Sequence, residues 1–197
     1  MSERTARIAR TTKETDIELS IDLDGTSATD IDTGIGFFDH MLTAFGRHGL
    51  FDLSVRAEGD LEVDGHHTVE DVGIVAGQAF ASALGDKRGI RRFGSITLPM
   101  DEALILAAVD ISGRGQLFWE ADVPAVMVGS FDATLAKEFF IAFAANAGVT
   151  LHIRELAGEN THHVIEGMFK AVARAMRQAV EADPRMGDAL PTTKGAL

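Results

Sequence analysis

Two short stretches of this chain repeat the same order of residues, and this repetition restricts the possible folds more than any other feature. Residues 66–70 read His-His-Thr-Val-Glu, and residues 162–166 read His-His-Val-Ile-Glu. Each stretch follows a similar apolar segment, residues 49–55 in one case and residues 148–153 in the other. Because whole blocks of pattern recur in the same order, the sequence predicts a duplicated half-domain.

The expected elements come in a similar order in both halves of the chain. Alternating side chains predict strands, and apolar residues three or four positions apart predict helices. The first half has expected strands at 6–12, 17–23 and 51–57 and helices at 37–45 and 69–83. The second has strands at 95–98, 103–111, 116–121 and 149–153 and helices at 134–147 and 163–181. We therefore predict one domain over 1–197 with an α+β fold, whose halves, about 1–90 and 91–197, each pack helices on one face of a small sheet.

The composition narrows the functions open to the chain. Its 197 residues, 46% of them hydrophobic, suffice for one folded core. The lack of cysteine excludes disulfides and thiolate ligands, so nitrogen and oxygen must hold any metal. A net charge of -12 disfavours nucleic acid and anionic membranes as partners, while local basic residues still allow a small phosphorylated ligand. Because there is no apolar run of about 20 residues and no signal peptide, we expect a cytoplasmic protein.

The repeated motif carries the chemistry that the sequence suggests. It contains four of the seven histidines, and its spacing places His66 over Glu70 and His162 over Glu166 on a helix. Imidazole combined with carboxylate favours Mn, Fe, Zn or Ni over Ca or Mg. One such motif is more often a pair of surface histidines. Two copies at the starts of buried helices are hard to explain as core packing, because burying an unpaired imidazole or carboxylate costs free energy. Each motif can therefore bring two imidazoles and one carboxylate to one spot, and its duplication suggests two transition-metal ions. The sequence leaves open how the ligands divide between the ions, since the two histidines of a pair can also reach different ones.

Each half offers one further donor on its shorter helix. His40 lies in the first short helix and Glu138 at the matching place of the second half, which brings the possible protein ligands to eight. Taken alone, His40 beside Asp39 would be read as a capped or solvated residue. Four protein ligands per ion would leave two positions of an octahedron open to a substrate, which suits catalysis.

Several further strings in the chain resemble imidazoleglycerol-phosphate dehydratase. The resemblance extends from about Arg10 to the C-terminus and is specific, because independent motifs occur in the right order. The strings that carry it are residues 38–42, 59–71, 92–94, 99–103, 110–114, 160–163 and 191–195.

The resemblance implies a fold like domain 2 of ribosomal protein S5 and a shell of 24 subunits whose active sites are completed at subunit contacts. It implies two Mn²⁺ ions per subunit and a phosphorylated small-molecule substrate, imidazole glycerol phosphate, which becomes imidazole acetol phosphate and water in histidine biosynthesis. The place of the eighth ligand, commonly a histidine in the family, is held here by Glu138. The implied metal ligands are His40, His66, His67, Glu70, Glu138, His162, His163 and Glu166. The implied phosphate ligands are Arg92, Arg114, Lys170, Thr192 and Lys194.

The chemistry explains why such a site is needed. The hydrogen to be removed is not acidified by a neighbouring carbonyl, so the substrate's own imidazole must relay electrons, as an imidazolate bound to two manganese ions. The resemblance assigns Glu14 to substrate binding and proton transfer, with catalytic roles also for His40, His67 and Glu166. Lys170, four residues after Glu166, fits an ordinary helical ion pair as well as a phosphate ligand.

Two other classes of function account for part of this pattern. A shell that stores Mn or Fe explains the histidines but leaves Arg92, Arg114 and Lys194 without a role. A dinuclear metallohydrolase explains the metals and a phosphate site, and it would cleave an ester or amide.

Overall fold

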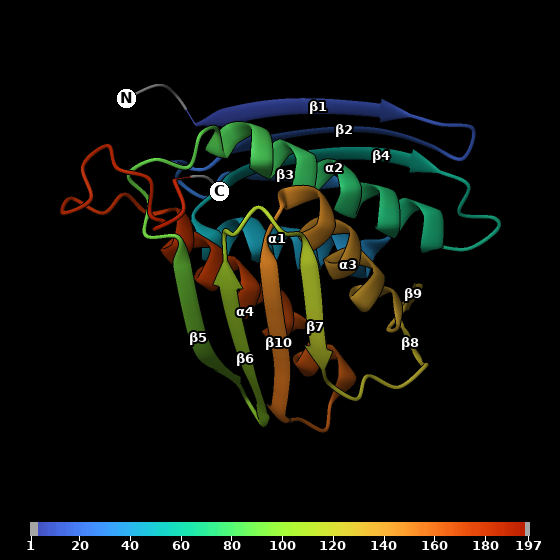
Figure 1. Cartoon of the computed structure of the whole chain (residues 1–197). Coiled ribbons are helices and arrows are strands. Elements are labelled where there is room, and N and C mark those ends of the chain that lie inside the picture. The colour runs from blue at the N-terminus through green and yellow to red at the C-terminus, as the bar shows by residue number, and fades with distance from the viewer. Residues whose placement is uncertain (1–3, 196–197) are drawn as a thin grey trace.

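Two four-stranded sheets enclose the helices of this chain in a sheet, helix, sheet arrangement (Figure 1). The computed structural model describes residues 4–195. The first half contributes the upper sheet of Figure 1 and the second half the lower one, and the long helices lie between them. The elements of the first half are β1 (Thr5–Thr11), β2 (Thr15–Asp22), β3 (Thr29–Asp32), α1 (Gly36–Gly49), β4 (Asp52–Gly59) and α2 (His66–Leu84).

The second half repeats the topology of the first. The strand orders are β1-β2-β4-β3 and β5-β6-β10-β7, and in each sheet the last two strands are parallel while the others are antiparallel. This confirms the predicted α+β fold with a duplicated half-domain. The elements are β5 (Phe93–Met100), β6 (Ala103–Asp110), β7 (Gln116–Glu120), β8 (Met127–Val128), β9 (Phe131–Asp132), α3 (Leu135–Ala147), β10 (Thr150–Ala157) and α4 (Thr161–Val180).

The halves are joined by helices that pack across the boundary between them. α1 packs on α4, and α2 packs on α3, so each contact pairs a helix of one half with a helix of the other. Aromatic rings fill the space between these helices: Phe139 lies 5.1 Å from Phe169 and 5.5 Å from Phe38 between ring centroids. Burying each such side chain stabilises the fold by roughly 1.5–3 kcal/mol. The two halves therefore share one core.

The expected elements are present, and the structure adds three short strands. β3 has the polar sequence Thr-Asp-Ile-Asp and forms the parallel edge of the first sheet beside β4. β8 and β9 form a two-stranded hairpin ahead of α3. A four-residue edge strand exposes most of its side chains, so it leaves little apolar periodicity to detect. Within residues 4–195 no helix is long and apolar enough to cross a membrane.

Candidate metal centre

α1 and α4 bring three of the predicted ligands together. The Nε2 atom of His40 lies 3.3 Å from Oε2 of Glu166, and that of His162 lies 3.1 Å from the same oxygen. One ligand atom from each of the three residues lies within 4.8 Å of the others. Donors bound to one ion at about 2.0–2.2 Å are separated by roughly 3–4.4 Å, so this group needs little movement to hold one. Two imidazoles with one carboxylate fit a transition metal.

The start of α4 fixes two histidines at once. The side chain of Asn160 accepts the backbone N–H groups of His162 at 2.9 Å and His163 at 3.4 Å, which caps the helix. His162 is then held by the edge of the Phe37 ring, with 4.9 Å between ring centroids. The cluster is therefore built across the two halves, because α1 comes from the first half and α4 from the second.

Glu166 is kept ionised in a buried place. Only 7% of the residue is exposed, and burial alone would raise the pKa of its carboxyl group. The Lys170 ammonium, 2.7 Å from Oε1, and the neighbouring His40 outweigh burial and hold the pKa of Glu166 below its ordinary value. An ionised carboxylate is the form that binds a metal. Lys170 thus forms the helical ion pair that its spacing allowed.

The first motif assembles a smaller group. Nε2 of His66 lies 3.3 Å from Oε2 of Glu70, but no third donor among residues 4–195 joins this pair within 4.8 Å. Glu138, the expected third member, is half-buried on α3. A hollow of about 510 Å³ opens beside His66, with Met127 and Leu135 on its wall. This half of the predicted centre is therefore incomplete within one chain.

The second histidine of each motif meets a carboxylate outside the motif. Nδ1 of His67 lies 3.1 Å from Asp60 and 3.9 Å from Glu14, and Nδ1 of His163 lies 2.8 Å from Glu102. Within residues 4–195 the two imidazoles of a motif therefore do not meet at one spot, which favours the alternative that they reach different ions. Consecutive helical residues do not face each other, and each glutamate turns to the histidine four positions earlier.

These contacts change the acidity of both partners. A hydrogen bond to Asp60 raises the pKa of His67, and a hydrogen bond to Glu102 raises the pKa of His163. The same contact with His163, helped by the backbone N–H of Asn160, lowers the pKa of Glu102 to about 2. Glu102 is thus an ionised acceptor for an imidazole N–H.

Glu14 lies at the turn between β1 and β2. The hydroxyl of Thr12 accepts the backbone N–H groups of Glu14 and Thr15, both at 3.0 Å, which shapes the turn. The Glu14 carbonyl accepts the N–H of Asp60 at 3.1 Å. This places an exposed carboxylate beside the His67 ring.

The predicted phosphate ligands gather in two places. Arg92 donates to Asp110 at 2.7 and 3.2 Å and to the carbonyl of Pro191 at 2.8 Å, which brings the C-terminal tail to the arginine. Arg114 lies 3.8 Å from Asp110. In the tail, the hydroxyl of Thr192 accepts the N–H of Lys194 at 3.1 Å. Lys170 does not join this group, because it pairs with Glu166 at the metal cluster.

Sequence reasoning gave no role to four carboxylates that the structure places against predicted site residues. A partial signal was available, because in each half a glutamate occupies the hairpin turn that precedes the motif: Glu14 between β1 and β2, and Glu102 between β5 and β6. The contacts of Asp101 and Glu102 with His163 span about 60 positions of sequence, which local pattern does not reveal, and Asp60 and Asp110 lie in or beside loops, where no periodicity sets the direction of a side chain. The four carboxylates are Asp60, Asp101, Glu102 and Asp110.

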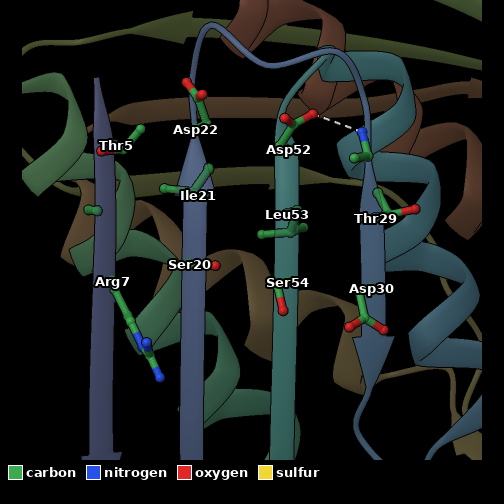
Figure 2. A pocket seen from close by; sticks show the side chains of 12 residues that line it. Thr5, Arg7, Ser20, Ile21, Asp22, Thr29, Asp30, Asp52, Leu53 and Ser54 are labelled. Atoms are coloured by element: carbon green, nitrogen blue, oxygen red, sulfur yellow. Dashed lines mark hydrogen bonds between the residues drawn. The ribbon is translucent and has the colours of Figure 1, made fainter. Parts of the chain in front are cut away.

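The outer face of the first sheet carries a different hollow. Figure 2 shows this hollow, of about 600 Å³, over strands β1, β2, β4 and β3, with Arg7, Asp22, Asp30 and Asp52 among its lining residues. None of the predicted site residues lines it. Its carboxylates would repel a phosphorylated ligand. The candidate site is therefore at the starts of the long helices.

Comparison with known proteins agrees with the geometry. The family model described as imidazoleglycerol-phosphate dehydratase matches residues 33–176. Relatives of that name from Acidiphilium cryptum (strain JF-5) and Roseobacter denitrificans (strain ATCC 33942 / OCh 114) are 63% and 60% identical over 194 residues, which is 98% of this chain and 99% and 100% of theirs.

Two solved structures of proteins with this name have similar folds. The structure from Staphylococcus aureus subsp. aureus N315 gives a TM-score of 0.82 at 42% identity and covers 91% of this chain and 99% of its own. The structure from Pyrococcus furiosus, in complex with (S)-C348, also gives 0.82, at 38% identity, and covers 96% of this chain and 100% of its own. The chain therefore belongs to the imidazoleglycerol-phosphate dehydratase family.

Proposed function

We propose that this chain is the hydro-lyase of histidine biosynthesis that converts D-erythro-imidazole glycerol phosphate to imidazole acetol phosphate and water. Family membership over nearly the whole chain supports the reaction. The observation that carries the proposal within the molecule is the group formed by His40, His162 and Glu166, which has the donors of a transition-metal site.

The proposed cofactor is two Mn²⁺ ions per subunit. His40, His162 and Glu166 would hold one ion, and His66 and Glu70, with Glu138, would contribute to the other. His67 and His163 would each supply one further ligand atom to these ions. When bound, the two ions would supply the positive charge that makes the imidazolate form of the substrate accessible near neutral pH. Ionised Glu166 fits this role because its charge is retained despite burial.

The chain's own side chains would then bind the substrate and move its protons. Glu14, whose carboxylate lies 3.9 Å from His67, would remove the hydrogen from the carbon next to the departing hydroxyl. Arg92 and Arg114 would bind the phosphate with their planar guanidinium groups. The tail residues Thr192 and Lys194 would complete that site, since Arg92 holds the tail through the Pro191 carbonyl.

We propose further that the active sites are shared in a homo-oligomer of 24 subunits. The His66–Glu70 pair lacks a third donor within residues 4–195, and Nδ1 of His67 and of His163 meets a carboxylate outside the motif. Donors from a second copy would complete such a group. The number 24 rests on the family resemblance alone.

The decisive experiment combines product analysis with metal removal. The protein is incubated with imidazole glycerol phosphate and Mn²⁺, and ketone and inorganic phosphate are both measured. Ketone formation that stops with a chelator and returns with Mn²⁺ is the expected result. Release of phosphate without ketone would identify a metallohydrolase instead, and metal uptake with neither product would identify a storage protein.

A further inference from the structure

The four motif histidines divide into two pairs according to the ring nitrogen that meets a carboxylate. His66 and His162 turn Nε2 toward the glutamate four positions later. His67 and His163 turn Nδ1 toward a carboxylate outside the motif, Asp60 in the first half and Glu102 in the second. The same division appears in both halves although the two acceptors come from different elements.

We propose that Glu102 is a positioning residue that fixes the proton of His163 on Nδ1 and so leaves Nε2 as its metal-binding atom, and that Asp60 does the same for His67. This inference rests on the proposed function, in which both histidines bind metal. A neutral imidazole carries one N–H, and an ionised carboxylate can only accept a hydrogen bond. The ring nitrogen that faces the carboxylate must therefore be the protonated one, and the other nitrogen keeps its lone pair.

Glu102 is itself held rigidly on the side away from the histidine. Its Oε1 atom accepts the backbone N–H of Asn160 at 2.8 Å and that of Glu159 at 3.4 Å, while Oε2 faces His163. Since the Asn160 side chain also caps α4, the turn between β5 and β6 is tied to the start of the helix. One oxygen of Glu102 therefore binds the backbone of the loop before α4, and the other binds the His163 ring.

Asp101 does not compete for this role. Its carboxylate lies 3.7 Å from Nε2 of His163, which is too long for a hydrogen bond, and 76% of its side chain is exposed. Nε2 therefore has no hydrogen-bonded acceptor among residues 4–195, which is what a ligand atom requires.

The Glu102→Gln variant tests the proposal through the direction of one hydrogen bond. The amide oxygen is expected to keep the place of Oε1, because two backbone N–H groups must donate to it. The amide nitrogen then faces His163 and donates, so Nδ1 must accept and the proton moves to Nε2. The fold is retained and the wrong tautomer is produced.

Two measurements report this change without relying on turnover. Solid-state ¹⁵N NMR of metal-free, histidine-labelled protein, prepared at a pH high enough to keep the His163 ring neutral, gives its protonated nitrogen, and the signal is assigned by its loss in His163→Ala. Titration with Mn²⁺, followed by electron paramagnetic resonance, gives the affinity. We expect the proton on Nδ1 in the wild type and on Nε2 in Glu102→Gln, with Mn²⁺ bound about 10–100-fold more weakly in the variant.

Glu159→Gln is the matched control, because it removes one exposed negative charge from the same loop. It should keep the wild-type tautomer and affinity. An unchanged tautomer in Glu102→Gln, or an equal loss of affinity in the control, would overturn the inference. If His163→Ala binds both ions as the wild type does, the metal role of His163 in the proposed function fails. If His163→Ala binds weakly while Glu102→Gln binds normally, only the positioning role fails.

Discussion

Glu14 shows how little a single residue reveals before its surroundings are known. In the sequence it is one exposed glutamate among many, and only the resemblance gave it a role. The structure places its carboxylate 3.9 Å from His67, a predicted ligand from a helix that begins more than 50 positions later. The turn that presents it is held by Thr12 and by the N–H of Asp60.

The Glu14→Gln variant should lose turnover while keeping its metal. The amide retains the shape of the side chain but cannot take a proton, so we expect kcat to fall by about 10²–10⁴-fold. Metal content per chain, measured by mass spectrometry of the digested protein, should match the wild type. Glu62→Gln, another exposed glutamate, is the control and should be fully active. Full activity in Glu14→Gln would remove this residue from the mechanism.

One substitution can separate the ion pair of Lys170 from its proposed role in phosphate binding. Its ammonium lies 2.7 Å from Glu166, which is the ion pair, and the resemblance makes it a phosphate ligand. In Lys170→Met the stem is kept and the charge is lost. If the charge binds phosphate, KM should rise by roughly 10–100-fold, the equivalent of one hydrogen bond to a charged group. Steady-state kinetics give the KM. A lower thermal midpoint with an unchanged KM would show that Lys170 forms the ion pair with Glu166 and does not bind phosphate.

Among the elements, α4 depends on close contact with β5. A Cβ atom added at Gly94 would meet the carbonyl oxygen of Ala175 at 1.9 Å, so only glycine allows this approach. Gly94→Ala must push the helix off the sheet, and we expect it to destabilise the protein by about 1–3 kcal/mol. Gly36→Ala is the control, because nothing lies within 4 Å of its added Cβ. Thermal unfolding of both variants tests this, and equal midpoints would contradict it.

The loop that leads into β3 depends on one carboxylate. Asp52 accepts the backbone N–H groups of Thr26 at 2.7 Å and Ala28 at 2.8 Å, the second of which Figure 2 shows. The hydrogen bond from Ala28 leads the causes that lower the pKa of Asp52. Because the folded pKa is below the unfolded one, this stabilisation is complete above about pH 4 and is lost as the pH falls through the folded value.

Asp52→Asn should therefore destabilise the protein near neutral pH and matter less in acid. Near neutral pH, after allowance for solvent exposure, we expect the substitution to lower the free energy of unfolding by roughly 0.5–1 kcal/mol. Thermal midpoints of both proteins, measured from pH 7 to pH 3, should converge at the acid end. A difference that stays constant over this range would show that the charge of Asp52 does not contribute.

The elements also mark where sequence pattern is sufficient. The long helices and central strands were predictable because their apolar residues recur with a clear period, as in Ile17, Leu19 and Ile21 of β2. β3 was not predictable because its sequence lacks apolar alternation, and the strand forms through its pairing with β4, more than 20 positions away. The direction of the second histidines was missed for a similar reason, since Asp60 and Glu102 lie outside the helices that carry the motifs.

At the scale of the whole molecule, the duplication has a consequence for the candidate site. The cluster on α4 takes His40 from α1, so the three residues come from opposite halves. The matching place on α2 and α3 has Glu138 where the first cluster has a histidine, and it holds only the His66–Glu70 pair. Residues 4–195 therefore contain one assembled group, and the proposed second ion would take donors from another copy.

Sharing of this kind can be tested by combining two inactive chains. His162→Ala removes a member of the α4 cluster, and His67→Ala removes a ring that faces away from its own motif. Mixed particles, co-produced with a different affinity tag on each variant and purified through both tags, should regain Mn²⁺-dependent dehydration. An intact cluster from the His67→Ala chain can then meet an intact His67 from the other.

Two variants within the same cluster provide the control. His162 and Glu166 lie 3.1 Å apart in one chain, so mixing His162→Ala with Glu166→Ala leaves every cluster with a defect and should restore nothing. If the first mixture also stays inactive while its particles have the wild-type mass, each site is built from a single chain. Within residues 4–195 the direction of the His67 ring would then be explained by its contacts with Asp60 and Glu14.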